Sequence, residues 1–143
     1  MSKYLIQRFK KVFATMTLLA LVAGFSMPVA NAIAPIISGT SVSQLKINPA
    51  GWETTLFHFE LNTASTVTVS VWRKNTAGGL DTFIKDFMYN QYLGAAGYNV
   101  EWDGSDDIGN TVSNGFYYFR VAASTVDGST TFTSPTSPNV TVE

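Results

Sequence analysis

Apolar and polar residues alternate along most of the chain beyond residue 40, and this alternation constrains the fold more than any other feature. Successive side chains of a β-strand point to opposite faces, so a period of two indicates strands with one buried and one exposed face. The 3.6-residue periodicity of an amphipathic helix is absent from this part of the sequence. The sequence therefore predicts an all-β domain.

Seven short segments carry this alternation, and turn residues separate them. We expect the strands at 42–47, 54–61, 66–73, 82–89, 98–102, 116–123 and from Thr130 onward, with irregular stretches at 91–97 and 103–115. Asp127-Gly128 is expected to form the last hairpin turn. Seven short strands with turns about every 8–12 residues are typical of an immunoglobulin- or fibronectin-III-like β-sandwich.

The first 32 residues have a different character. Four of the nine basic residues fall within the first eleven positions, an uncharged and mainly apolar run follows, and Ala30-Asn31-Ala32 forms a small-residue site. This order is typical of a cleaved secretory signal peptide. We therefore expect residues 1–32 to be removed and residues 33–143 to form one domain that is secreted, extracellular or at the cell surface. A periplasmic location and a retained N-terminal anchor are the alternatives.

Composition narrows the function classes of the expected mature chain. Removing residues 1–32 leaves five basic against ten acidic residues, so the domain lacks the positive surface that nucleic acids or anionic membranes require. The chain has no cysteine, which excludes disulfides and thiolate chemistry. We expect no cofactor, and we expect partners among other surface or extracellular proteins, the chain itself included, or polysaccharides.

Ten residues at fixed spacing form the most specific motif of the sequence. They are Trp102, Asp103, Gly104, Asp106, Gly109, Val112, Gly115, Tyr117, Phe119 and Val121. Together with Asn48-Pro49, Val67-x-Val69-x-Val71 and Gly97-Tyr98-x-Val100, they resemble the immunoglobulin-like domain of the flagellar hook-capping protein FlgD, a family also found in many secreted bacterial proteins. The resemblance spans residues 37–142 and departs at Ala50, where the family commonly has phenylalanine.

The resemblance implies a fold rather than an activity. The signature glycines are expected to allow tight turns, the aspartates to cap backbone N–H groups, and the aromatic residues to fill the core. These residues are Gly104, Gly109 and Gly115; Asp103 and Asp106; and Trp102, Tyr117 and Phe119. Because the chain carries a secretory signal and no hook-binding region, we do not expect it to be the flagellar cap.

Few residues have the chemistry of a catalytic or metal site. His58 is the single histidine and falls on the outward face of an expected strand, so we expect no enzymatic activity. Asp103, Asp106 and Asp107 with Asn110 could offer oxygen ligands to calcium, but Ile108 stands where a calcium-binding loop needs glycine. We expect these acidic residues to cap turns and leave calcium as the alternative.

Two binding hypotheses remain. The leading one is a non-catalytic module of cell-surface or extracellular assembly, in which the apolar segment at Ile33, Ile36 and Ile37 adds as a strand to a neighbour's sheet edge and propagates into filaments. The alternative is a small carbohydrate-binding or adhesion protein. Six aromatic residues outside the inward register could stack on sugars or contact a subunit: Trp52, Trp72, Tyr89, Tyr92, Phe116 and Tyr118.

Overall fold

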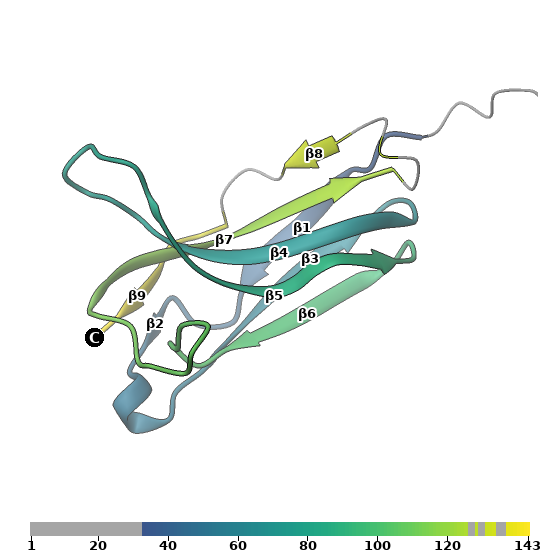
Figure 1. The fold of residues 1–143 in the computed structure, drawn as a ribbon. Helices are drawn as coiled ribbons and strands as arrows, with labels where there is room; N and C mark the ends of the chain where they lie inside the picture. Colours follow the sequence, from purple (N-terminus) through teal and green to yellow (C-terminus); the bar gives the residue numbers. More distant parts are fainter. Residues whose placement is uncertain (1–32, 126–127, 129–130, 134–136) are drawn as a thin grey trace, which may run out of the picture. The chain divides into compact units, whose positions relative to one another are not determined.

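The computed structural model describes residues 33–125, 128, 131–133 and 137–143, so the expected signal peptide lies outside the described residues. Two β-sheets lie face to face (Figure 1). The smaller sheet has the order β1 (Ile37–Val42), β3 (Thr55–Leu61), β6 (Gly97–Trp102). The larger has the order β2 (Lys46–Ile47), β9 (Val140–Val142), β7 (Gly115–Ser124), β4 (Ser65–Arg73), β5 (Thr82–Leu93), with β8 (Thr131–Thr133) also paired to β7. The predicted all-β sandwich is confirmed.

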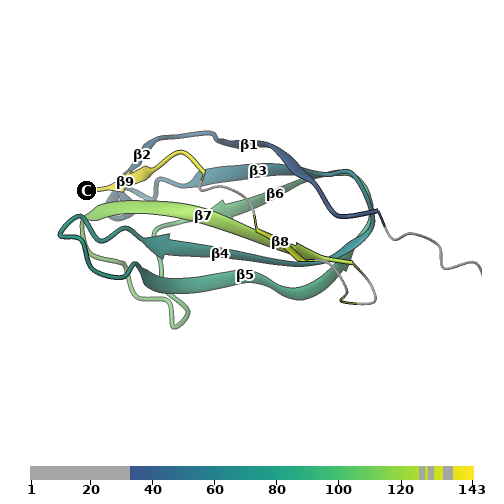
Figure 2. The same ribbon diagram turned by 90° about the horizontal axis from the view of Figure 1, so that it is seen from above.

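The chain passes from one sheet to the other at several connections, among them those from β3 to β4 and from β6 to β7 (Figure 2). At the connection from β6 to β7, the Tyr117 hydroxyl donates a hydrogen bond to the backbone oxygen of Ser113, four residues upstream. This is the tyrosine corner found in immunoglobulin-like sandwiches, where a tyrosine near the start of a strand fixes the turn that precedes it. In the described part of the chain, no helix is long and apolar enough to span a bilayer.

The core lies between the sheets and follows the predicted alternation. Thr55, Phe57, Phe59 and Leu61 all face inward from β3. The Phe57 ring stacks on Phe119 of β7 with 4.6 Å between ring centroids, which joins the two sheets directly. The other large side chains that are fully or almost fully buried come from five different strands: Ile47, Val67, Val69, Val71, Trp102, Tyr117, Val121, Val140 and Val142.

The strand expected at 42–47 is two strands in different sheets. β1 ends at Val42 and pairs with β3, whereas β2 begins at Lys46 and pairs with β9 in parallel. The chain changes sheet between them, and alternation alone does not mark such a change. Lys46 of β2 and Glu143, the residue after β9, form an ion pair.

β5 is longer than predicted and continues through residues expected to be irregular. It runs on to Leu93 because Asn90 adopts a positive φ of 48° and its backbone N–H donates to the Thr68 hydroxyl at 3.1 Å. This local bulge changes the register with β4, after which pairing resumes at Val67 and Gln91. Asparagine tolerates the left-handed conformation better than most residues do.

The C-terminal strand is also divided in two. The segment expected from Thr130 onward forms β8 and β9, and the sequence between them contains Pro135 and Pro138, which cannot donate to a ladder. Gly128 has a positive φ of 72°, and its N–H donates to the Thr125 oxygen, as a turn requires. Asp127, the other residue of the expected turn, lies outside the described residues.

The N-terminal apolar segment differs from expectation in one important respect. Ile37 is buried and pairs with Leu61 of its own domain, and the Ile36 N–H donates to the Asn62 side chain at 2.6 Å. Ile37, one of the residues expected to add to a neighbour's sheet edge, therefore pairs within its own domain. Ile33 and Ile36 are exposed.

Candidate functional site

Two loops that are far apart in the sequence pack on each other at one end of the sandwich. The first carries the 3-10 turn η1 (Pro49–Gly51), and the second is the signature loop, residues 103–114. Gly104 lies directly against the Pro49 ring, so that a Cβ at Gly104 would overlap it, and its φ is 77°. The structure thus brings together two of the motifs that resemble the FlgD immunoglobulin-like family, Asn48-Pro49 and Trp102-Asp103-Gly104.

The signature loop is held by its aspartates, as expected. Asp103 Oδ1 accepts hydrogen bonds from the N–H and the hydroxyl of Ser105, at 3.0 and 2.6 Å. Asp106 Oδ1 accepts from the N–H groups of Ile108 and Asn110, at 3.1 and 2.8 Å. The hydrogen bond from the Ser105 hydroxyl is the main reason that the pKa of Asp103 lies below its usual value.

The remaining signature residues have structural roles. The Trp102 Nε1 donates to the Ser105 backbone oxygen at 2.9 Å, and its ring packs against Tyr117 and Phe119. Gly109 has a φ of 83°, while Gly115 approaches the Arg73 guanidinium closely. Val121 is buried, and Val112 is partly buried against the core.

The alternative of a calcium site in the signature loop depends on which carboxylate oxygens the loop leaves free. Asp106 Oδ1 accepts hydrogen bonds from two backbone N–H groups, and its Oδ2 lies 3.5 Å from the side-chain amide nitrogen of Asn110. Asp107 is exposed. Across the part of the chain that the structure describes, no three His, Cys, Asp or Glu side chains gather closely enough to hold a metal ion.

His58 lies on the outer face of β3, as predicted from the alternation. Its Nδ1 is 2.9 Å from Asn99 Oδ1 of β6, and its Nε2 is 3.8 Å from Glu60 Oε1 of the same strand. Both ring nitrogens therefore face neighbouring polar side chains on the sheet surface.

Trp52 has the most unusual environment of the six aromatic residues. It ends η1 with φ 61° and ψ 26°, a left-handed conformation that costs a bulky residue roughly 1–3 kcal/mol. Its side chain is 92% exposed. Beside it lies a cleft of about 230 Å³ whose walls include Glu53, Thr54 and Asp103. The sequence contains no signal for this backbone conformation.

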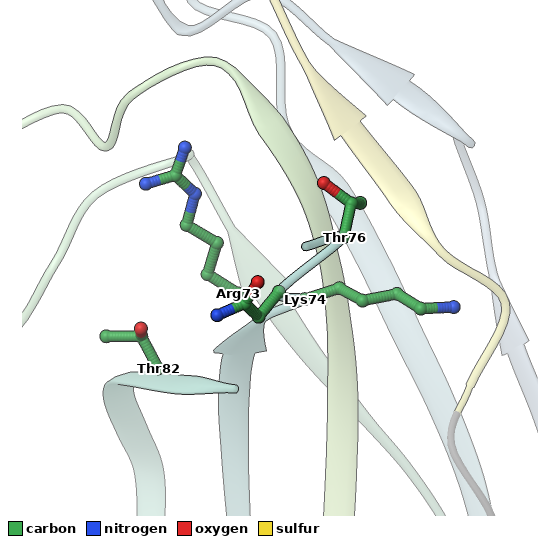
Figure 3. A pocket seen from close by; sticks show the side chains of 5 residues that line it. Arg73, Lys74, Thr76 and Thr82 are labelled. Atoms are coloured by element: carbon green, nitrogen blue, oxygen red, sulfur yellow. The ribbon is translucent and has the colours of Figure 1, made fainter. Parts of the chain in front are cut away.

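A second pocket, of about 260 Å³, lies where β4 ends and is lined by Arg73, Lys74, Asn75, Thr76 and Thr82. Figure 3 shows the Arg73 and Lys74 side chains extending in different directions rather than converging on one point. The Arg73 guanidinium also donates to the Asn114 backbone oxygen at 3.2 Å. The pocket therefore lacks the converging donors that an anion site requires.

The outer face of the larger sheet carries a row of aromatic side chains. Tyr118, Trp72 and Phe83 are directly paired across β7, β4 and β5. Trp72 and Phe83 meet edge to face at 5.4 Å, and Arg120 lies over the Trp72 ring. Tyr118, expected to be exposed, is instead buried, and its hydroxyl donates to Asp81 Oδ2 at 2.7 Å.

This tyrosine makes the stability of the domain sensitive to alkaline pH. Burial, followed by the hydrogen bond to Asp81, raises the pKa of Tyr118 to about 12, against about 10 for an unfolded tyrosine. The unfolded state therefore loses the proton first, and stability should fall as pH rises from about 10 to about 12. In Tyr118→Phe this fall should be smaller, as denaturant titrations at several pH values would show. Equal falls in both proteins would contradict this assignment.

The sheet edges differ in how well they are protected against pairing with another strand. β2 has two residues, and the pairing of both β1 and β5 is interrupted by register shifts, which are common edge protections. β6 pairs with β3 in unbroken register from Gly97 to Trp102. Within the described residues β6 has no other strand partner, so its outer edge is open.

Comparison with known proteins does not add to this picture. No protein-family model matches the chain, and no curated protein matches it. The resemblance to the FlgD immunoglobulin-like family stays a prediction from the signature residues.

Proposed function

We propose that the chain is an exported, non-catalytic β-sandwich module of the FlgD immunoglobulin-like type, which acts in cell-surface or extracellular structures as a dimer paired through the edge of β6. The open, regular edge of β6 carries this proposal. The absence of a membrane-binding or nucleic-acid-binding charge pattern in the sequence and the fold-serving roles of the signature residues are consistent with it.

The direction of the backbone groups in β3 identifies those that β6 presents outward. The Leu56 oxygen accepts from Ser43 on the β1 side, whereas the Leu61 N–H donates to Ala96 on the β6 side. The backbone N–H and C=O groups of successive strand residues point alternately to the two sides of the strand. Since those of Leu56 point toward β1, those of Phe57 point toward β6, where Val100 is the partner residue. Asn99 and Glu101, the neighbours of Val100, consequently direct theirs away from the domain.

A second copy of β6 is a suitable partner for this edge. In an antiparallel pair centred on Asn99, Glu101 of each copy lies opposite Gly97 of the other, so no like charges face each other. Such a contact uses the same surface on both subunits and has two-fold symmetry. It joins two three-stranded sheets into one continuous sheet.

Proline at position 99 tests this contact, because proline removes an outward N–H without removing a bond to β3. We expect the parent protein to dimerise with rising concentration in sedimentation velocity, and Asn99→Pro to remain monomeric. Asn99→Ala is the matched control: it also loses the contact with His58 but keeps the N–H, and should dimerise. A parent that is monomeric at every concentration, or an Asn99→Pro variant that dimerises normally, would refute edge pairing.

A further inference from the structure

Several hydrogen bonds hold the η1 turn that carries Trp52. Asn48 Oδ1 accepts from the Ala50 N–H at 3.1 Å, and the Asn48 N–H donates to Glu53 Oε2 at 2.7 Å. The Trp52 N–H itself donates to the Pro49 oxygen at 3.0 Å. The Pro49 ring in turn packs against Gly104. Trp52 is thus held on a rigid support, although its ring is 92% exposed.

The exposed ring and its strained backbone are unfavourable for folding and bring no packing in return. A left-handed φ is tolerated by glycine or asparagine at little cost, and a large apolar ring is normally buried. Backbone strain that the surrounding structure maintains occurs preferentially at ligand sites. The combination therefore indicates that Trp52 contacts a ligand.

The polar groups beside Trp52 define the chemistry of that ligand. The cleft is lined by two carboxylates, Glu53 and Asp103, and by the hydroxyl residues Thr54, Ser105 and Thr111. Each carboxylate accepts hydrogen bonds from its own loop through one oxygen, and the hydrogen bond from Ser105 lowers the pKa of Asp103. These groups accept hydrogen bonds from hydroxyl groups and repel anions.

We propose that this cleft, which we call the Trp52 cleft, binds a neutral saccharide. The apolar C–H face of a sugar ring stacks on the indole. The hydroxyl groups of the sugar donate to the carboxylates and to the hydroxyl oxygens of Thr54 and Ser105, whose own protons are donated to Glu101 and Asp103. At about 230 Å³ the cleft is smaller than the pockets of about 300–1,000 Å³ that enclose drug-sized ligands, so it fits one ring at a time. The argument for this site does not rest on pairing through β6.

Isothermal titration calorimetry of the purified protein tests this proposal with cello-, xylo-, manno- and chito-oligosaccharides at millimolar concentration. Polygalacturonic acid serves as the anionic comparison and tetramethylammonium chloride as the cationic one. We expect at least one neutral oligosaccharide to bind and the acidic polymer not to bind. Binding by none of the neutral saccharides, or by tetramethylammonium alone, would overturn the proposal.

Trp52→Gly separates binding from folding. Glycine relieves the positive φ, so this variant should melt at a higher temperature than the parent while its affinity for the saccharide falls by roughly 10–100-fold. Tyr92→Ala, which removes an exposed ring far from the cleft in the sequence, should retain the parent affinity. Affinity that persists in Trp52→Gly, or that falls equally in Tyr92→Ala, would show that the Trp52 cleft is not the binding site.

Discussion

Replacing Trp102 by alanine should lower the free energy of unfolding by about 3–5 kcal/mol. The side chain is fully buried, packs 5.1 Å from Tyr117 and 6.1 Å from Phe119 between ring centroids, and hydrogen-bonds the Ser105 oxygen. Its removal leaves a cavity between the sheets and an unpaired carbonyl in the signature loop. Urea denaturation followed by circular dichroism measures the effect.

Trp72→Ala is the internal comparison for this measurement. Trp72 has the same size, but it lies half-buried on the outer face of β4, and we expect a clearly smaller loss of stability. If the two variants lose similar amounts, or if Trp102→Ala unfolds at the parent's denaturant concentration, the packing described for the core is wrong.

Gly104→Ala should be the most damaging of the glycine substitutions, with a loss of about 2–5 kcal/mol. Two costs combine: alanine at a φ of 77° is strained by about 1–2 kcal/mol, and its Cβ collides with the Pro49 ring, which adds the roughly 1–3 kcal/mol of overpacking. Thermal and urea unfolding of the variant measure the sum.

Gly109→Ala separates the two costs. Its φ of 83° is nearly the same, but nothing lies within 4 Å of the added Cβ, so only the backbone strain should remain. A loss at Gly104 equal to that at Gly109 would mean that the two loops do not pack as described, and it would also weaken the argument that Trp52 stands on a rigid support.

The sequence predicted the sandwich because alternation indicates which side chains share a face of a strand. The inward-facing residues were predicted correctly for β3, β4 and β6. It did not predict where a strand leaves one sheet for the other, as at Ser43 between β1 and β2, because both partners require the same alternation. The bulge at Asn90 was also missed, since one positive φ within a strand leaves the polar pattern almost unchanged.

The candidate sites were predicted less completely than the fold. The aspartate caps followed from residue type and spacing, and the exposure of Trp52 followed from its place outside the strands. The position of Trp52 beside the signature loop depends on the contact between Pro49 and Gly104. These two residues are far apart in the sequence, and local sequence patterns do not reveal such a contact. Tyr118 was expected on the surface, but it is buried and hydrogen-bonded to Asp81 in the neighbouring hairpin loop, a contact that the strand alternation does not reveal.

Photo-crosslinking in the producing cells tests the proposed assembly through β6 most directly. A photoreactive amino acid replaces Asn99 on the outward edge or, as the control, Ile108 on the exposed signature loop. The account predicts a cross-linked product of twice the subunit mass from position 99 in the exported fraction, and little from position 108. Equal cross-linking at both positions, or no adduct from position 99 in the exported protein, would contradict it.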